Sequence, residues 1–150
     1  MRPTLILAAF LASGTTMASP EVSVPPHIVR DFHAAVPKVS GNGKATVWQV
    51  AGKEEGAKNA FFGVLELTMG AKVPVHRDAT EEYLYIVSGT GEITIDGKST
   101  AVTPGFAIFM PAEAEVSFVV TGTEVVRAVQ FFAGQGPEAK YEGWASGPAK

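Results

Sequence analysis

The sequence contains no cysteine, and this absence removes two kinds of chemistry. A disulfide framework is excluded, so packing must stabilise the fold, and no thiolate is present to act as a nucleophile or a metal ligand. Any bound metal would have to be held by nitrogen and oxygen atoms, and the chain has only 3 histidines. A lipid anchor on cysteine is excluded for the same reason.

The chain also lacks an excess of positive charge, since 12 Lys and Arg residues against 15 Asp and Glu residues give a formal net charge of −3. The basic residues are scattered, which provides no basic surface for nucleic acid, and we predict no such partner. A hydrophobic content of 46% with 18% charged residues is typical of a globular protein. The 150 residues suffice for one domain with a proper core.

Long hydrophobic runs are scarce, and the most apolar one runs from Leu5 to Ala12. It follows Arg2 and precedes a small, polar stretch that ends at Ala18, a pattern typical of a secretory signal peptide. We expect cleavage near Ala18 and a periplasmic or secreted mature protein; the alternative is an apolar N-terminal helix of the domain. No run is long enough to span a bilayer, so we expect no membrane span.

From residue 45 onward, short stretches rich in β-branched and aromatic residues alternate with turn signals. Asp96-Gly97 between two of them is a strong signal for a tight hairpin. No stretch of ten or more residues after residue 44 has helical periodicity, so we predict an all-β sandwich or barrel. The expected strands are 45–50, 60–69, 82–88, 92–96, 99–102, 106–110, 115–120 and 124–132.

The two ends of the chain are predicted to be less regular. Residues 1–18 would be the signal peptide and 19–44 an extended N-terminal arm, rich in Pro, Gly and Ser, with one helical turn near 28–35. The barrel would cover residues 45–138, and 139–150 would form an irregular tail that carries Tyr141 and Trp144 onto the surface. Trp48, Phe61 and Phe109 are expected in the core or the pocket wall.

The stretch 70–89 concentrates metal-capable side chains in otherwise apolar, strand-like sequence. His76 and Asp78 are two residues apart, so they project from the same face of an extended segment. Glu82 opens the next strand and shares its inward face with two aliphatic residues, so we expect it beside the other two. His76, Asp78 and Glu82 are the candidate ligand-binding and metal-binding residues, and His76 and Glu82 the candidate catalytic ones.

The spacing of Gly70, His76, Glu82 and Gly89 resembles the first motif of the cupin superfamily: Gly, five residues, His-x-His, three or four residues, Glu, six residues, Gly. Asp78 stands at the second His of that motif. The resemblance covers roughly 45–138, and implies a jelly-roll β-barrel with a pocket.

The second cupin motif is only partly kept. Gly105 and Pro111 have the family's spacing, but Glu113 stands where Gly is expected, Val116 where the ligand His is expected and Val120 where Asn is expected. The resemblance to cupins with three imidazoles and a carboxylate therefore implies a changed centre, with one imidazole and two carboxylates. Such a ligand set shifts the metal preference toward hard cations.

Two interpretations of the pocket stay open at this point. In one, His76, Asp78 and Glu82 bind a divalent metal such as manganese, iron, zinc or copper. In the other, the pocket is metal-free, and an imidazole flanked by carboxylates moves a proton.

The functional hypotheses follow from the same residues. The first is an exported small cupin whose pocket binds a small polar molecule, with or without a divalent metal. The second is a metal-free or metal-dependent lyase, isomerase or oxygenase acting on a small molecule, and the third is a non-catalytic interaction protein with a vestigial pocket.

Two further expectations concern the sheet faces. Small cupins commonly dimerise through the sheet that faces away from the pocket, so the resemblance implies a homodimer. Tyr83 and Tyr85 lie on the strand face opposite Glu82 and would suit that role. Arg127 and Gln130 lie on opposite faces of the last strand, so one of them should face the pocket.

Overall fold

The structure is a computed structural model that describes residues 27–147; the predicted signal peptide and the start of the predicted arm lie outside the described residues. Within the described range, no helix has the length and apolar character needed to cross a membrane. Strands dominate the chain. The elements are η1 (Phe32–Ala34), β1 (Lys38–Val39), β2 (Ala45–Ala51), β3 (Ala60–Leu67), β4 (Lys72–His76), β5 (Glu81–Ser88), β6 (Gly91–Ile95), β7 (Lys98–Val102), β8 (Ala107–Met110), β9 (Val116–Val120), β10 (Val126–Ala133), η2 (Pro137–Tyr141) and β11 (Ala145–Ser146).

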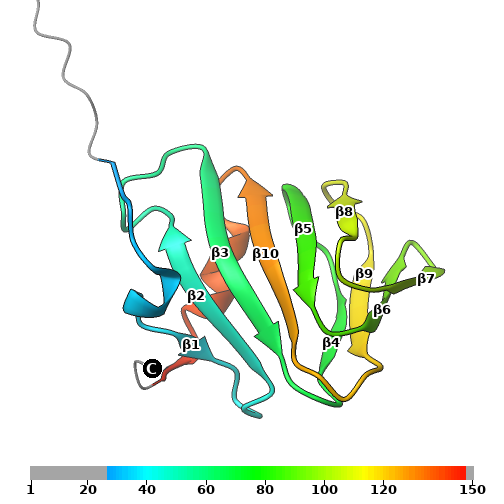
Figure 1. Cartoon of the computed structure of the whole chain (residues 1–150). Coiled ribbons are helices and arrows are strands. Elements are labelled where there is room, and N and C mark those ends of the chain that lie inside the picture. Colours follow the sequence, from blue (N-terminus) through cyan, green and yellow to red (C-terminus); the bar gives the residue numbers. More distant parts are fainter. Residues whose placement is uncertain (1–26, 148–150) are drawn as a thin grey trace, which may run out of the picture.

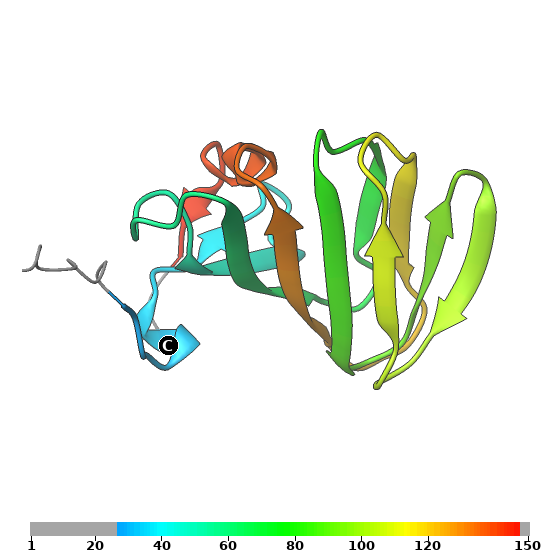
Figure 2. The same cartoon turned by 90° about the horizontal axis from the view of Figure 1, so that it is seen from above.

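The strands form two antiparallel sheets that face each other (Figures 1 and 2). The larger sheet has seven strands in the order β11-β1-β2-β3-β10-β5-β8, and the smaller has four in the order β4-β9-β6-β7. The short helix η2, orange-red in both views, lies on the same side of the large sheet as the small sheet. This is the jelly-roll arrangement predicted from the sequence.

Each predicted strand is present, with ends shifted by a few residues at most. Three strands were not predicted: β4, which ends at His76, and the two-residue strands β1 and β11. β1 comes from the predicted arm and β11 from the predicted tail, and they pair with each other at Lys38 and Ser146. The two ends of the described chain therefore extend the large sheet.

Positive φ angles explain the residue types at the Asp96-Gly97 turn and at Gly89. Asp96 and Gly97 have φ values of 46° and 77°, as a tight hairpin between β6 and β7 requires, so the predicted turn is confirmed. Gly89 has a φ of 74°, and a Cβ atom there would lie 2.6 Å from the Val125 carbonyl oxygen. Any side chain at residue 89 would push β5 away from the start of β10.

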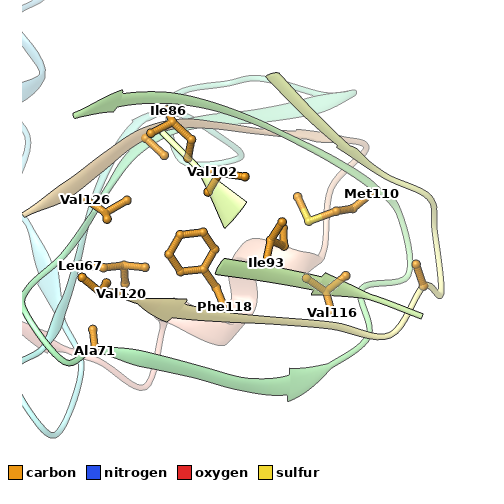
Figure 3. Close-up of a cluster of buried hydrophobic side chains, with 12 residues drawn as sticks. Leu67, Ala71, Ile86, Ile93, Val102, Met110, Val116, Phe118, Val120 and Val126 are labelled. Carbon is orange, nitrogen blue, oxygen red and sulfur yellow. The ribbon is translucent and has the colours of Figure 1, made fainter. Parts of the chain in front are cut away.

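The main hydrophobic core lies between the two sheets (Figure 3). Phe118 points into its centre, and Val116 and Val120 share its face of β9, as strand parity predicts. The buried residues of this cluster are Leu67, Ala71, Ile86, Ile93, Val102, Met110, Ala114, Val116, Phe118, Val120, Val126 and Ala128. All of them except Val102, Ala114 and Val120 line the cavity that holds the candidate site.

The expected positions of three aromatic residues have different outcomes. Trp48 and Phe61 are buried, as predicted. The prediction for Phe109 is wrong, because its side chain is 50% exposed. Strand parity in β8 directs the Phe109 side chain to the outer face, where its ring centroid lies 5.2 Å from that of Tyr83. Tyr83 and Tyr85 are exposed on this outer face, as expected.

Candidate functional site

A cavity of about 560 Å³ opens between the two sheets and contains the polar cluster. Most of its wall is aliphatic, with Leu84, Ile86, Ile93 and Phe118 among the lining residues. Seven of the polar lining residues gather around the end of β4, the start of β5, β10 and helix η2; they are His76, Arg77, Asp78, Glu82, Gln130, Lys140 and Tyr141. The other polar lining residues are Ser40, Asn42, Lys44 and Lys72. A pocket of this kind, apolar with a few convergent polar groups, is suited to a small organic molecule.

His76 ends β4, and its ring is held from one side. Nδ1 lies 2.9 Å from the Pro74 carbonyl oxygen, which can only accept, so Nδ1 carries a proton and donates it. Nε2 lies 3.5 Å from Oδ2 of Asp78. The ring nitrogen that faces the cluster is therefore Nε2.

Asp78 follows the strand end, and its side chain is engaged by a residue from the far end of the chain. The Lys140 ammonium donates to Oδ1 at 2.9 Å and to Oδ2 at 2.7 Å. The Asp78 backbone carbonyl accepts from the Glu113 amide at 2.7 Å, which ties this loop to the loop before β9. Asp78 thus has two cationic neighbours when His76 is protonated.

Glu82 is only 5% exposed and has a polar network behind it. Gln130 donates from Nε2 to Oε1 of Glu82 at 2.6 Å, and the Tyr141 hydroxyl donates to Oε1 of Gln130 at 2.9 Å. Gln130 is therefore the residue of β10 that faces the pocket. Arg127 points away from the pocket, and its guanidinium group donates a hydrogen bond to Glu66 on the neighbouring strand β3.

The pKa values of the three cluster residues are shifted in different directions. The hydrogen bond to Asp78 raises the pKa of His76, in spite of partial burial. Burial acts to raise the pKa of Asp78, but the bonds to His76 and Lys140 outweigh it and the pKa is lowered. Burial raises the pKa of Glu82, although the Gln130 bond opposes the shift. The arrangement favours a protonated His76 beside an ionised Asp78.

The structure brings together the three residues singled out in the sequence. One ligand atom from each of His76, Asp78 and Glu82 lies within 4.8 Å of the others. Small side-chain movements would bring the three atoms to the distances at which they could bind one metal ion. Val116 lies opposite His76 in the β4–β9 register, so an aliphatic side chain stands where a third imidazole would be. The assignment of these residues as ligands, or as acid and base, stays a prediction.

The partners of these side chains do not fit a divalent ion as they stand. Both oxygens of Asp78 accept from the Lys140 ammonium, and Oε1 of Glu82 accepts from Gln130. A metal on this ligand set would have to displace a cation that is already bound to one of its two carboxylates.

Lys140 and Tyr141 were missed as site residues in the sequence. The expectation that Tyr141 lies on the surface is wrong, because the side chain is buried and its ring packs against those of Phe61 and Trp144. A usable signal was present: Pro137 can begin a helical turn, and residues 141 and 144, three apart, then share one face. The turn η2 carries Lys140 into the pocket.

The comparisons with known proteins agree with this geometry. The family model described as "Cupin domain" matches residues 63–132, from β3 through β10, which span the candidate site. The solved structures similar in fold are cupins as well, including an RmlC-like cupin from Shewanella frigidimarina with a TM-score of 0.64 at 15% identity, covering 77% of this chain and 99% of that one. Residues 63–132 of the chain therefore form a cupin domain.

One curated relative is similar over most of its length. The cupin chain is 28% identical over 139 residues to dimethylsulfoniopropionate lyase DddW of Ruegeria pomeroyi, covering 88% of this chain and 89% of the relative. A solved structure, the lyase DddQ of the same organism, is similar in fold with a TM-score of 0.56 at 20% identity, over 63% of this chain and 49% of that one. At that identity the structural likeness concerns the fold alone.

Proposed function

We propose that this cupin is a small-molecule lyase that uses its own side chains for proton transfer. The observation that carries the proposal is the pairing, at one end of an apolar cavity, of an imidazole held toward its protonated form and a buried carboxyl group. The likeness to a lyase, DddW, supports this class of reaction over isomerisation or oxygenation.

Glu82 would act as the base in this proposal. Burial raises the pKa of its carboxyl group, and a carboxylate with a raised pKa is a better proton acceptor than an exposed one. The proton would pass from a substrate carbon to Glu82, the C–H electron pair would form the new double bond, and the leaving group would depart with its bonding pair. The Gln130–Tyr141 pair orients the Glu82 carboxylate during that step.

His76 would stabilise charge or supply a proton at the opposite side of the substrate. Its Nδ1–H is fixed on the Pro74 carbonyl oxygen, so only Nε2 faces the cavity. Asp78 keeps the imidazolium form favourable, which suits a hydrogen-bond donor to a negatively charged substrate group. The roles of Glu82 and His76 are thus separated by their surroundings.

The first test uses dimethylsulfoniopropionate, because the relative DddW carries that activity in its name. Purified protein is incubated with the compound, and dimethyl sulfide is measured in the headspace by gas chromatography. We expect release that falls by about 100-fold or more in His76→Gln and Glu82→Gln, the range typical of lost acid or base groups. The control is Tyr85→Phe, on the outer face.

Two results would count against the proposal. If both variants keep full activity, His76 and Glu82 are not the acid and base. If the protein cleaves neither this compound nor other small organic acids with a leaving group next to an acidic C–H bond, the pocket binds a ligand without turnover. In that case a shift in melting temperature on ligand addition would identify the ligand.

We also propose export. N-terminal sequencing of the protein from a periplasmic or culture fraction would show a start near residue 19 if the signal peptide is cleaved near Ala18.

We further propose that a second copy of the chain covers the outer face in a homodimer. Tyr83, Phe109 and Phe131 are exposed together on this face, and the Tyr83 ring packs against the other two. Light scattering of wild type and Tyr83→Glu tests this, and a monomeric wild type would contradict it.

A further inference from the structure

Lys140 reaches into the cupin pocket with its ammonium group, while its side chain stays 32% exposed. Its Nζ atom is bound by both oxygens of Asp78, whose side chain is only 13% exposed. The charge also acts on the other two members of the cluster: the pKa values of His76 and Glu82 are both raised overall, and the Lys140 charge opposes each rise. One ammonium group therefore interacts with all three predicted metal ligands.

The position of the ammonium group is fixed by the packing of η2. Tyr141, the next residue, is buried against Phe61 and Trp144, with ring centroids 6.1 Å and 5.0 Å away. The Lys140 nitrogen lies 4.8 Å from the centroid of the Phe132 ring, close enough for a cation–π contact. A lysine held by an anchored turn, a carboxylate and an aromatic face is preorganised in this place.

Arg77, the cationic residue next to the cluster in the sequence, is engaged elsewhere. Arg77 donates to the Glu113 carbonyl and pairs with Glu115 at 2.9 Å, and its side chain is half exposed. In the described residues, Lys140 is thus the lysine that donates directly to a carboxylate of the cluster. Its charge opposes a second cation at the same carboxylates.

We propose that Lys140 is the resident cation of this cupin centre and keeps divalent metals out of it. In wild type, His76, Asp78 and Glu82 bind divalent ions weakly, and removal of the Lys140 charge opens a metal site on these three side chains. The inference concerns cation binding and does not rest on the proposed lyase activity.

The test measures Mn²⁺ binding to the full chain after dialysis against a chelator. Free Mn²⁺ is followed by electron paramagnetic resonance at neutral pH, for wild type, Lys140→Met, Lys140→Gln and Lys140→Arg. We expect the Met and Gln variants to bind at least about tenfold more tightly than wild type, because a unit charge a few ångströms away no longer opposes the ion. The Arg variant keeps the charge and should stay as weak as wild type.

Two controls separate this site from general surface binding. Lys98→Met removes a charge from the exposed start of β7 and should leave Mn²⁺ affinity at the wild-type value. Adding His76→Ala to Lys140→Met should abolish the gain. Circular dichroism melting curves confirm that each variant is folded, and a Mn²⁺-dependent rise in melting temperature gives a second readout.

Several outcomes would overturn the inference. Wild-type protein that takes up one equivalent of Mn²⁺ when protein and metal are mixed in equal amounts has no cation barrier, and this part of the test needs no variant to fold. A folded Lys140→Met that gains no affinity shows that something other than the charge keeps the ion out. A gain that persists in the double variant with His76→Ala places the ion elsewhere.

Discussion

The Nζ atom of Lys140 lies 2.7 Å from Oδ2 of Asp78, although 62 residues separate the two in the sequence. This contact brings the turn η2 into the cupin pocket and gives Asp78 an ammonium group as a hydrogen-bond donor. Asp78 in turn raises the pKa of His76 through the bond between them. The protonation of the imidazole is therefore set partly by a residue beyond the barrel strands.

Replacing Asp78 by Asn should lower the pKa of His76. The variant removes the hydrogen-bonded carboxylate that raises this pKa and leaves the Lys140 charge, which lowers it, uncompensated. The measurement is an NMR titration of the metal-free protein, with the His76 signal assigned from its loss in His76→Gln. His33, which pairs with Asp31 away from the pocket, serves as the internal control.

The same pKa shift has a consequence for stability. Because the folded pKa of His76 is raised above 6.5, its contribution is complete below that value and is lost as the pH rises through the folded pKa. As the pH rises through the folded pKa of His76, the free energy of unfolding of wild type should therefore fall by more than that of His76→Gln. An unchanged His76 pKa in Asp78→Asn would show that the 3.5 Å contact carries no weight.

Replacing Glu82 by Gln should raise the melting temperature by a few degrees at neutral and mildly alkaline pH. Burial raises the pKa of Glu82, so its ionisation opposes folding at high pH, whereas Gln remains neutral and its oxygen still accepts from Gln130. The difference between variant and wild type should vanish below the ordinary pKa of 4.5, where both side chains are neutral. Melting curves across the pH range would show this, and a variant less stable than wild type at pH 8 would contradict it.

Replacing Tyr141 by Phe should destabilise the protein by about 1–3 kcal/mol, because the buried Oε1 of Gln130 loses its hydrogen-bond donor. Urea unfolding at neutral pH measures this. The matched control is Tyr83→Phe, whose hydroxyl bonds to Glu81 at an exposed position and should change stability by less than about 0.5 kcal/mol. Equal effects of the two substitutions would mean that the inner network adds no stability.

Replacing Val116 by His in a Lys140→Met background should create a stronger zinc site. Val116 is paired with His76 across the β4–β9 ladder and lines the same cavity, so a new imidazole would enter the ligand set from the opposite strand. We expect Zn²⁺ affinity at least about tenfold above that of Lys140→Met alone, since zinc favours nitrogen ligands. Isothermal titration calorimetry measures it.

The control for this substitution is Ser117→His in the same background. Residue 117 neighbours 116 on β9 and therefore points to the other face of the sheet. If its zinc affinity rises as much as that of the Val116 variant, the added imidazole acts as a surface ligand and the geometry of the centre is not as described.

The sequence alone determined the strands of the two sheets other than β1, β4 and β11, and the meeting of His76, Asp78 and Glu82. Both follow from local rules: alternation with a period of two assigns each strand residue to a face, and inward-facing aliphatic neighbours carry Glu82 into the core. Parity also placed Val116 in the pocket wall and left Arg127 and Gln130 on opposite faces. Strand parity did not show which of Arg127 and Gln130 points into the pocket, because β10 carries apolar residues on both of its faces.

Only the tertiary structure decided what surrounds the three residues. Lys140 and Tyr141 reach the pocket because Tyr141 packs into an aromatic cluster with Phe61 and Trp144, from strands and turns far apart in the chain. The spacing of residues 141 and 144 after Pro137 indicates a turn with one aromatic face, but which strands that face meets depends on the assembled shape of the barrel. The sequence therefore placed the acidic and imidazole groups at the site, while nonlocal packing placed the cation beside them.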